Sequence, residues 1–178
     1  MVRHPPVTIP AGDTILDVLR WRAEHQPEQA AYVYLRDGLN ADTVLTYRDL
    51  VSRAQSIAGY LQTRFSPGER LLVVYPPGLE FVQAFWGALY AGLIAVPVPP
   101  PDAFRVKAGV ARVQRFAEDA GAAGALSTAH IVETLRSQEC AIALDHWITG
   151  DHARSADSSC WTDQRPQASH LAYLQYTS

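Results

Sequence analysis

Apolar residues along the first third of this 178-residue chain recur first at helical and then at strand spacing. A helix is predicted over residues 14–25, where Asp13 or Thr14 can cap the first turn. Two short strands are predicted at 31–35 and 43–45, on either side of a turn. A second helix is predicted to begin after a Thr46 cap and to run to about Arg64.

The clearest unit is a strand, a helix and a second strand. Residues 70–75 form a continuous apolar run, which is typical of a strand covered on both faces. The helix that follows has apolar residues at helical spacing from Leu79 to Leu89, and residues 93–98 form the next strand. Such a unit makes a right-handed crossover, so the pattern predicts two parallel strands.

The alternation of predicted strands and helices continues in the second half of the chain. A helix is predicted over 106–120, a strand over 121–126, a helix after Ser127-Thr128 and a strand over 141–144. Residues 146–169 show no period and are predicted to be a loop with at most one short turn, and 171–176 are predicted to form a last strand. The fold class predicted is α/β, a mostly parallel sheet with flanking helices.

Composition narrows the function classes. An apolar content of 48% with 19% charged residues is that of a globular protein. The net charge of −3 gives no reason to expect a nucleic-acid partner. The apolar run 84–98 is short for a membrane span, and the N-terminus lacks a secretory signal, so we expect no membrane span. Cys140 and Cys160 form no metal or disulfide pattern, which favours a cytoplasmic location.

Three stretches resemble the fatty acyl-AMP ligases of the acyl-adenylate-forming (AMP-binding) superfamily. They are Gly68 to Phe81 (GERLLVVYPPGLEF), Ala84 to Val98 (AFWGALYAGLIAVPV) and Ala172 to Ser178 (AYLQYTS). The last stretch is similar to the strand that leads into the Ser/Thr/Gly-rich ATP loop of that family. The resemblance covers about residues 13–145 and 171–178.

The resemblance implies the first α/β subdomain of the adenylate-forming fold. Residues 1–178 are then expected to be the N-terminal part of the AMP-binding domain, cut at the start of the ATP phosphate loop. The implied reaction joins a long-chain fatty acid to ATP, with Mg²⁺, and gives acyl-AMP. The acyl group then passes to an acyl carrier protein or a polyketide or peptide synthetase, which implies roles in lipid and polyketide synthesis.

Thr177 and Ser178 are the candidate phosphate-binding residues, because the resemblance aligns them with the start of that loop. Hydroxyl and backbone N–H groups there would contact ATP, while the glycines and the lysine of the loop would follow Ser178. No catalytic residue and no metal ligand is assigned. We therefore expect this chain by itself to be inactive in adenylation.

Three alternatives stay open. An acyl-CoA ligase or a peptide-synthetase adenylation domain shares the first half-reaction and differs in the acceptor. A non-catalytic binding module could retain this lobe alone. An unrelated doubly wound nucleotide-binding domain is disfavoured, because Pro76-Pro77-Gly78 stands where its glycine fingerprint would be and is interpreted as a turn.

Other groups favour structural roles. Phe81, Phe85 and Trp86 could line an acyl pocket, but their helical spacing is more typical of a core. The basic residues on the 106–120 helix and before it are interpreted as a solvated face that Glu118 and Asp119 balance locally, with a contact to an acidic carrier protein or a nucleotide tail as the alternative. These residues are Arg105, Lys107, Arg112 and Arg115. The pairs Asp145-His146 and Asp151-His152 match no zinc spacing.

Overall fold

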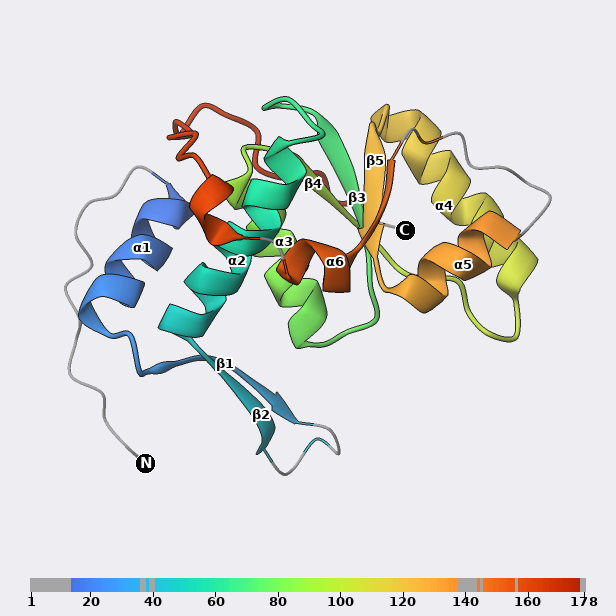
Figure 1. Cartoon of the computed structure of the whole chain (residues 1–178). Helices are drawn as coiled ribbons and strands as arrows, with labels where there is room; N and C mark the ends of the chain where they lie inside the picture. Colours follow the sequence, from blue (N-terminus) through green and yellow to red (C-terminus); the bar gives the residue numbers. More distant parts are fainter. Residues whose placement is uncertain are drawn as a thin grey trace.

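The computed structural model describes residues 14–35, 38, 41–137, 144, 146–155 and 157–176. Its main body is a parallel sheet with helices on both faces (Figure 1). The strands are β3 (Arg70–Val74), β4 (Ile94–Val98), β5 (Gly124–Ser127) and β6 (His146–Thr149), in the order β4-β3-β5-β6. Each neighbouring pair is parallel, which confirms the predicted α/β class.

Strand β3 lies inside the sheet, and its apolar run fills two cores. Leu71 and Val73 pack on the side of α2 (Tyr47–Gln62) and α3 (Leu79–Tyr90). Leu72 and Val74 pack on the side of α4 (Val106–Ala120) and α5 (Ala129–Ser137). All four side chains are fully buried, which explains why the run has no polar face.

The N-terminal elements are attached to the α2 side of the sheet. Helix α1 (Ile15–His25) packs against α2, and the antiparallel hairpin of β1 (Ala30–Leu35) and β2 (Ala41–Thr46) projects away from the main sheet (Figure 1). Both helix starts were correctly predicted. The Thr46 hydroxyl accepts the N–H of Asp49 at 3.2 Å, and Thr14 and Asp17 form a reciprocal capping box.

Replacing Thr14 with alanine is expected to lower the free energy of unfolding by about 1 kcal/mol, because the first turn of α1 loses its acceptor. Thr14→Ser keeps the hydroxyl and should retain most of the stability. Urea denaturation of the two variants and the parent chain measures this difference. Equal midpoints for the alanine and serine variants would show that the cap does not contribute.

The structure corrects two predictions near the C-terminus. Residues 146–169 are not all loop, because they contain β6, α6 (Gly150–Arg154) and η1 (Ser158–Cys160). Only Ile148 of β6 is fully buried, so this strand has too few core positions to give an apolar pattern. The predicted strand 171–176 is reduced to one bridge between Tyr173 and Ala95. The predicted strand 141–144 falls mostly on residues outside the described part.

Candidate functional site

The candidate phosphate-binding residues, Thr177 and Ser178, lie outside the described residues, but the segment leading to them is described. The backbone N–H of Ala95 in β4 donates to the carbonyl of Ala172 at 3.1 Å. The N–H of Leu174 donates to the carbonyl of Ala95 at 2.9 Å. Residues 172–174 therefore lie beside β4 and run parallel to it.

Side chains fix this segment between helices from the two faces of the sheet. The Tyr173 ring meets the edge of Phe85 in α3, with ring centroids 5.7 Å apart. The Tyr176 ring lies 4.5 Å from that of Phe116 in α4, and its hydroxyl donates to the Asp119 carboxylate at 2.6 Å. This hydrogen bond raises the pKa of Tyr176. The root of the candidate loop is thus held in place by folded elements.

The direction of the segment matters for its chemistry. Because it is parallel to β4, it runs from the amino edge of the sheet towards the carboxyl edge. Open α/β sheets bind their ligands outside the carboxyl ends of the strands, where loops can present N–H and hydroxyl groups to a phosphate. A phosphate-binding loop that follows Tyr176 would have this starting direction.

In open α/β sheets the ligand usually binds in a crevice at the carboxyl ends of the strands, and here side chains of the protein fill that place. Chain order reverses between β3 and β5, which makes their carboxyl ends the topological switch point. Tyr75 follows β3 there and is 5% exposed, and its hydroxyl oxygen lies 2.3 Å from where a Cβ on Gly150 would be. Burial raises the pKa of Tyr75 above its usual range, and the nearby Arg154 opposes that rise. Sequence reasoning identified neither Tyr75 nor its neighbour Gly150.

An ion-pair cluster closes this end of the sheet. The Arg154 guanidinium in α6 lies 3.1 Å from a carboxylate oxygen of Glu80 in α3 and also pairs with Asp151. It therefore joins the first turn of α3 to α6. Tyr75 and this cluster occupy the space beside the turn at Pro76-Pro77-Gly78. The turn therefore connects β3 to α3, which agrees with its interpretation from the sequence.

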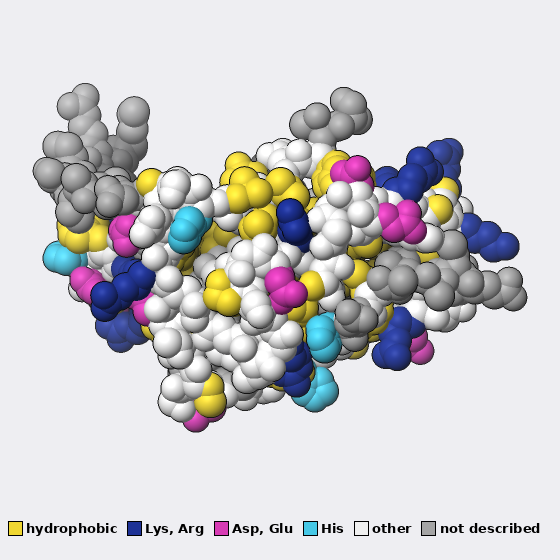
Figure 2. Space-filling view, turned by 90° about the horizontal axis from the view of Figure 1, so that it is seen from above, with side chains coloured by type: hydrophobic (Ala, Val, Ile, Leu, Met, Phe, Trp, Pro, Cys, Tyr) yellow, Lys and Arg dark blue, Asp and Glu magenta, His cyan; other side chains and the backbone are white. Residues whose placement is uncertain are grey.

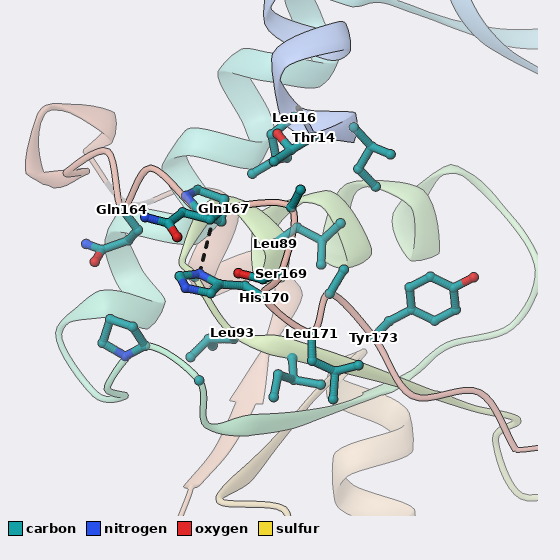
Figure 3. A pocket seen from close by; sticks show the side chains of 18 residues that line it. Thr14, Leu16, Leu89, Leu93, Gln164, Gln167, Ser169, His170, Leu171 and Tyr173 are labelled. Atoms are coloured by element: carbon teal, nitrogen blue, oxygen red, sulfur yellow. Dashed lines mark hydrogen bonds between the residues drawn. The ribbon is translucent and has the colours of Figure 1, made fainter. Parts of the chain in front are cut away.

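A cavity of about 700 Å³ lies at the opposite, amino edge of β3 and β4 (Figure 3). Apolar side chains of α1, α3 and the 171–173 segment contribute to it, among them Leu16, Leu89 and Leu171. Polar groups come from the 164–170 stretch, where the N–H of Gln167 donates to His170 Nδ1 at 3.3 Å. Among the residues that the structure describes, the lining carries no Lys, Arg, Asp or Glu side chain and is mostly apolar.

The remaining candidates divide between core and surface. Phe81 and Phe85 pack against the core on the α3 side, in agreement with the structural interpretation. Trp86 does so too, but it also lines a second cavity of about 290 Å³, and its Nε1 donates to the Tyr32 hydroxyl at 3.2 Å. Arg105, Lys107, Arg112 and Arg115 are all exposed.

Metal ligands were not predicted, and Asp145 lies outside the described part of the chain. Among the described residues, no group of three or more His, Cys, Asp or Glu side chains is placed to hold a metal ion. Within the same ranges, no helix is both long and apolar enough to cross a membrane.

Tyr90, at the end of α3, gives this region a pH-dependent stability. It is 1% exposed, and its hydroxyl makes no hydrogen bond of ordinary geometry with the described residues, although the Arg20 guanidinium lies beside the ring, with its Cζ 5.6 Å from the ring centroid. Burial raises the pKa of Tyr90 from 10.0 to about 12, an effect that the nearby Arg20 partly offsets. Above pH 10 the unfolded chain therefore loses the phenol proton while the folded chain keeps it, so stability is lost as pH rises from 10.0 towards about 12.

Tyr90→Phe should reduce this alkaline loss and should leave stability at neutral pH equal or higher by up to about 1 kcal/mol, because an unpaired buried hydroxyl is removed. Urea denaturation at neutral pH and above pH 10 measures both effects. Tyr75→Phe is the companion variant, since the pKa of Tyr75 is raised in the same direction. A Tyr90→Phe chain with the alkaline decline of the parent would contradict the assignment.

The chain, including the segment 171–176, matches known proteins over nearly its whole length. A profile of the AMP-binding enzyme family matches residues 19–178. The medium-chain-fatty-acid–(acyl-carrier-protein) ligase JamA of Moorena producens (strain JHB) is 35% identical over 173 residues, which cover 95% of this chain and 29% of the ligase. Human Disco-interacting protein 2 homolog A is 33% identical over 171 residues, covering 92% of this chain and 11% of that protein.

Solved structures agree with the sequence relatives. The crystal structure of a fatty acid AMP ligase from Legionella pneumophila superposes with a TM-score of 0.80 at 31% identity, covering 94% of this chain and 28% of that ligase. The chain belongs to the AMP-binding enzyme family, and its resemblance to the fatty acyl-AMP ligases is confirmed. It spans less than a third of the length of these relatives.

Proposed function

We propose that residues 1–178 are the N-terminal part of an AMP-binding domain that activates a long-chain fatty acid as acyl-AMP. The observation that carries the proposal is the segment 171–176, which is anchored beside β4 in a chain 35% identical to JamA. In this proposal Thr177 and Ser178 begin the ATP phosphate loop. JamA is named for medium-chain acids, so octanoate and palmitate both belong in the test.

The proposed reaction has two steps. A carboxylate oxygen of the fatty acid attacks the α-phosphorus of ATP, the bond from that phosphorus to the bridging oxygen breaks, and pyrophosphate leaves. The phosphopantetheine thiol of a carrier protein then attacks the acyl carbon, the carbon–oxygen bond of the anhydride breaks, AMP leaves, and the thiol proton passes to solvent.

This chain contributes the loop root and hydroxyl groups to the first step. N–H and hydroxyl donors beside the α-phosphate stabilise the charge that develops on it during attack. Mg²⁺ would neutralise the leaving pyrophosphate, but the described residues offer no cluster of ligands for it, and none is assigned.

The test separates the products formed from labelled fatty acid, ATP and Mg²⁺, with and without CoA and a carrier protein. The whole protein that contains this chain is compared with residues 1–178 alone. Acyl-AMP that persists with CoA and is consumed by the carrier protein supports the proposal, and residues 1–178 alone should form none. Conversion to acyl-CoA would identify an acyl-CoA ligase instead.

A second candidate is a non-catalytic binding module. It is favoured by the similarity to Disco-interacting protein 2 homolog A, whose name describes an interaction and not a reaction. In that case the whole protein would form no acyl-AMP from any acid tested.

A further inference from the structure

A basic surface with one protruding aromatic ring lies at the start of α4. Phe104 is 97% exposed, the highest value among the exposed large apolar side chains of the described residues. Between positions 105 and 115 the chain has four cations and no carboxylate, and the carboxylates of α4 follow at Glu118 and Asp119, which accept hydrogen bonds from Gln114 and Tyr176. We call Phe104, Arg105, Lys107, Arg112 and Arg115 the α4 basic surface.

Phe104 lies in a hydrogen-bonded turn before α4. The Asp102 carboxylate accepts the N–H of Phe104 at 2.7 Å, and the Asp102 carbonyl accepts the N–H of Arg105 at 3.0 Å. A Cβ on Gly109 would lie 2.6 Å from Cα of Pro101, so the proline connector packs directly on the first turn of α4. The backbone from which the exposed ring projects is therefore held by hydrogen bonds and packing.

The cations of this surface are available to a partner. Within the described part of the chain, no ion pair joins Arg105, Lys107 or Arg115 to a carboxylate. Arg112 donates to the carbonyl of Pro100 at 3.3 Å, which leaves its charge uncompensated. Lys and Arg side chains project at the end of the molecule that holds α4 and α5 (Figure 2).

We propose that the α4 basic surface docks an acidic carrier protein, with Phe104 as the apolar anchor of the contact. The proposal rests on the carrier-protein step of the proposed function. Aromatic and arginine side chains dominate binding energy at protein interfaces, and complementary charge guides the encounter. A backbone turn that is already ordered also loses little conformational freedom on binding.

A membrane is a poorer fit to the same surface. A helix that inserts into a bilayer needs a free apolar face, whereas Val110, Val113 and Ala117 of α4 are buried against the sheet. Phe104 alone would then have to anchor the protein.

The test measures binding of a fluorescently labelled holo-acyl carrier protein to the whole protein that contains this chain. We expect Phe104→Ala to raise the Kd at least about tenfold, as truncation of an interface anchor does. The double change Arg112→Glu with Arg115→Glu should weaken binding to a similar extent, and added salt should weaken the parent complex. Arg53→Glu, an exposed arginine of α2, is the matched control and should bind normally.

Two further readouts keep the outcomes distinct. Acyl-AMP formation without carrier protein reports on the proposed function alone and should be unchanged in all variants. Thermal unfolding should be unchanged by Phe104→Ala, and a clear drop would show that the ring packs inside the whole protein, which overturns the proposal. The proposal would also be overturned if the whole protein did not bind the carrier protein, or if the Phe104 and arginine variants bound it as the parent does. Binding to anionic vesicles instead of the carrier protein would overturn it too.

Discussion

Replacing Gly87 with valine is expected to lower the free energy of unfolding by about 3 kcal/mol or more, as overpacking of a closed helix contact does. Gly87 lies where α3 meets α2. A Cβ at this position would lie 2.4 Å from Cγ2 and 2.7 Å from Cβ of Ile57. Both sites are buried, so neither helix can move without opening the core that supports β3.

Helix propensity works against this result, which makes the outcome informative. Removing a glycine from a helix interior favours the helix by a few tenths to about 1 kcal/mol, so destabilisation can come only from the contact. Ala108→Val at an exposed position of α4 is the control and should cost about 0.5 kcal/mol. Denaturant titration of both variants gives the comparison. A Gly87→Val chain as stable as its parent would contradict the close approach of α2 and α3.

Replacing Thr177 with valine in the whole protein is expected to lower kcat/KM for ATP about a hundredfold, the usual effect of removing one donor to developing charge. Valine keeps the shape of threonine and removes only the hydroxyl, so the change isolates the proposed phosphate contact. Thr177→Ser keeps the hydroxyl and should retain most of the activity. Acyl-AMP formation at varied ATP concentration measures the effect.

Thr63→Ala is the matched control, because Thr63 is an exposed threonine at the end of α2. It should leave kcat/KM for ATP unchanged. Full activity of Thr177→Val, with ATP dependence like that of the parent, would remove Thr177 from the ATP site. The proposed function could then survive only with a different phosphate contact.

The parts of the fold that were predicted correctly are those whose residues, close together in the sequence, form a recognisable apolar or capping pattern. Strand β3 is buried on both faces and so gives an unbroken apolar run, and α4 buries one regular stripe. Thr14 and Thr46 were recognisable because a helix cap is a contact between residues three positions apart.

The parts that sequence reasoning missed depend on contacts across the chain. β6 has one fully buried residue, and its place in the sheet comes from pairing with β5. The approach of Tyr75 to Gly150 and the cavity between α1, α3 and the 164–173 stretch join distant segments, which leave no local pattern. The terminal segment was predicted as a strand from its apolar residues, but one bridge is what pairs it with β4.

The measurement that tests the central claim most directly is exchange of labelled pyrophosphate into ATP, dependent on fatty acid, by the whole protein that contains this chain. We expect exchange that requires the acid and that falls about a hundredfold in Thr177→Val. We also expect no exchange by residues 1–178 alone. If the whole protein folds but gives no exchange with octanoate, dodecanoate or palmitate, fatty acid adenylation is contradicted. The non-catalytic binding module is then the remaining proposal.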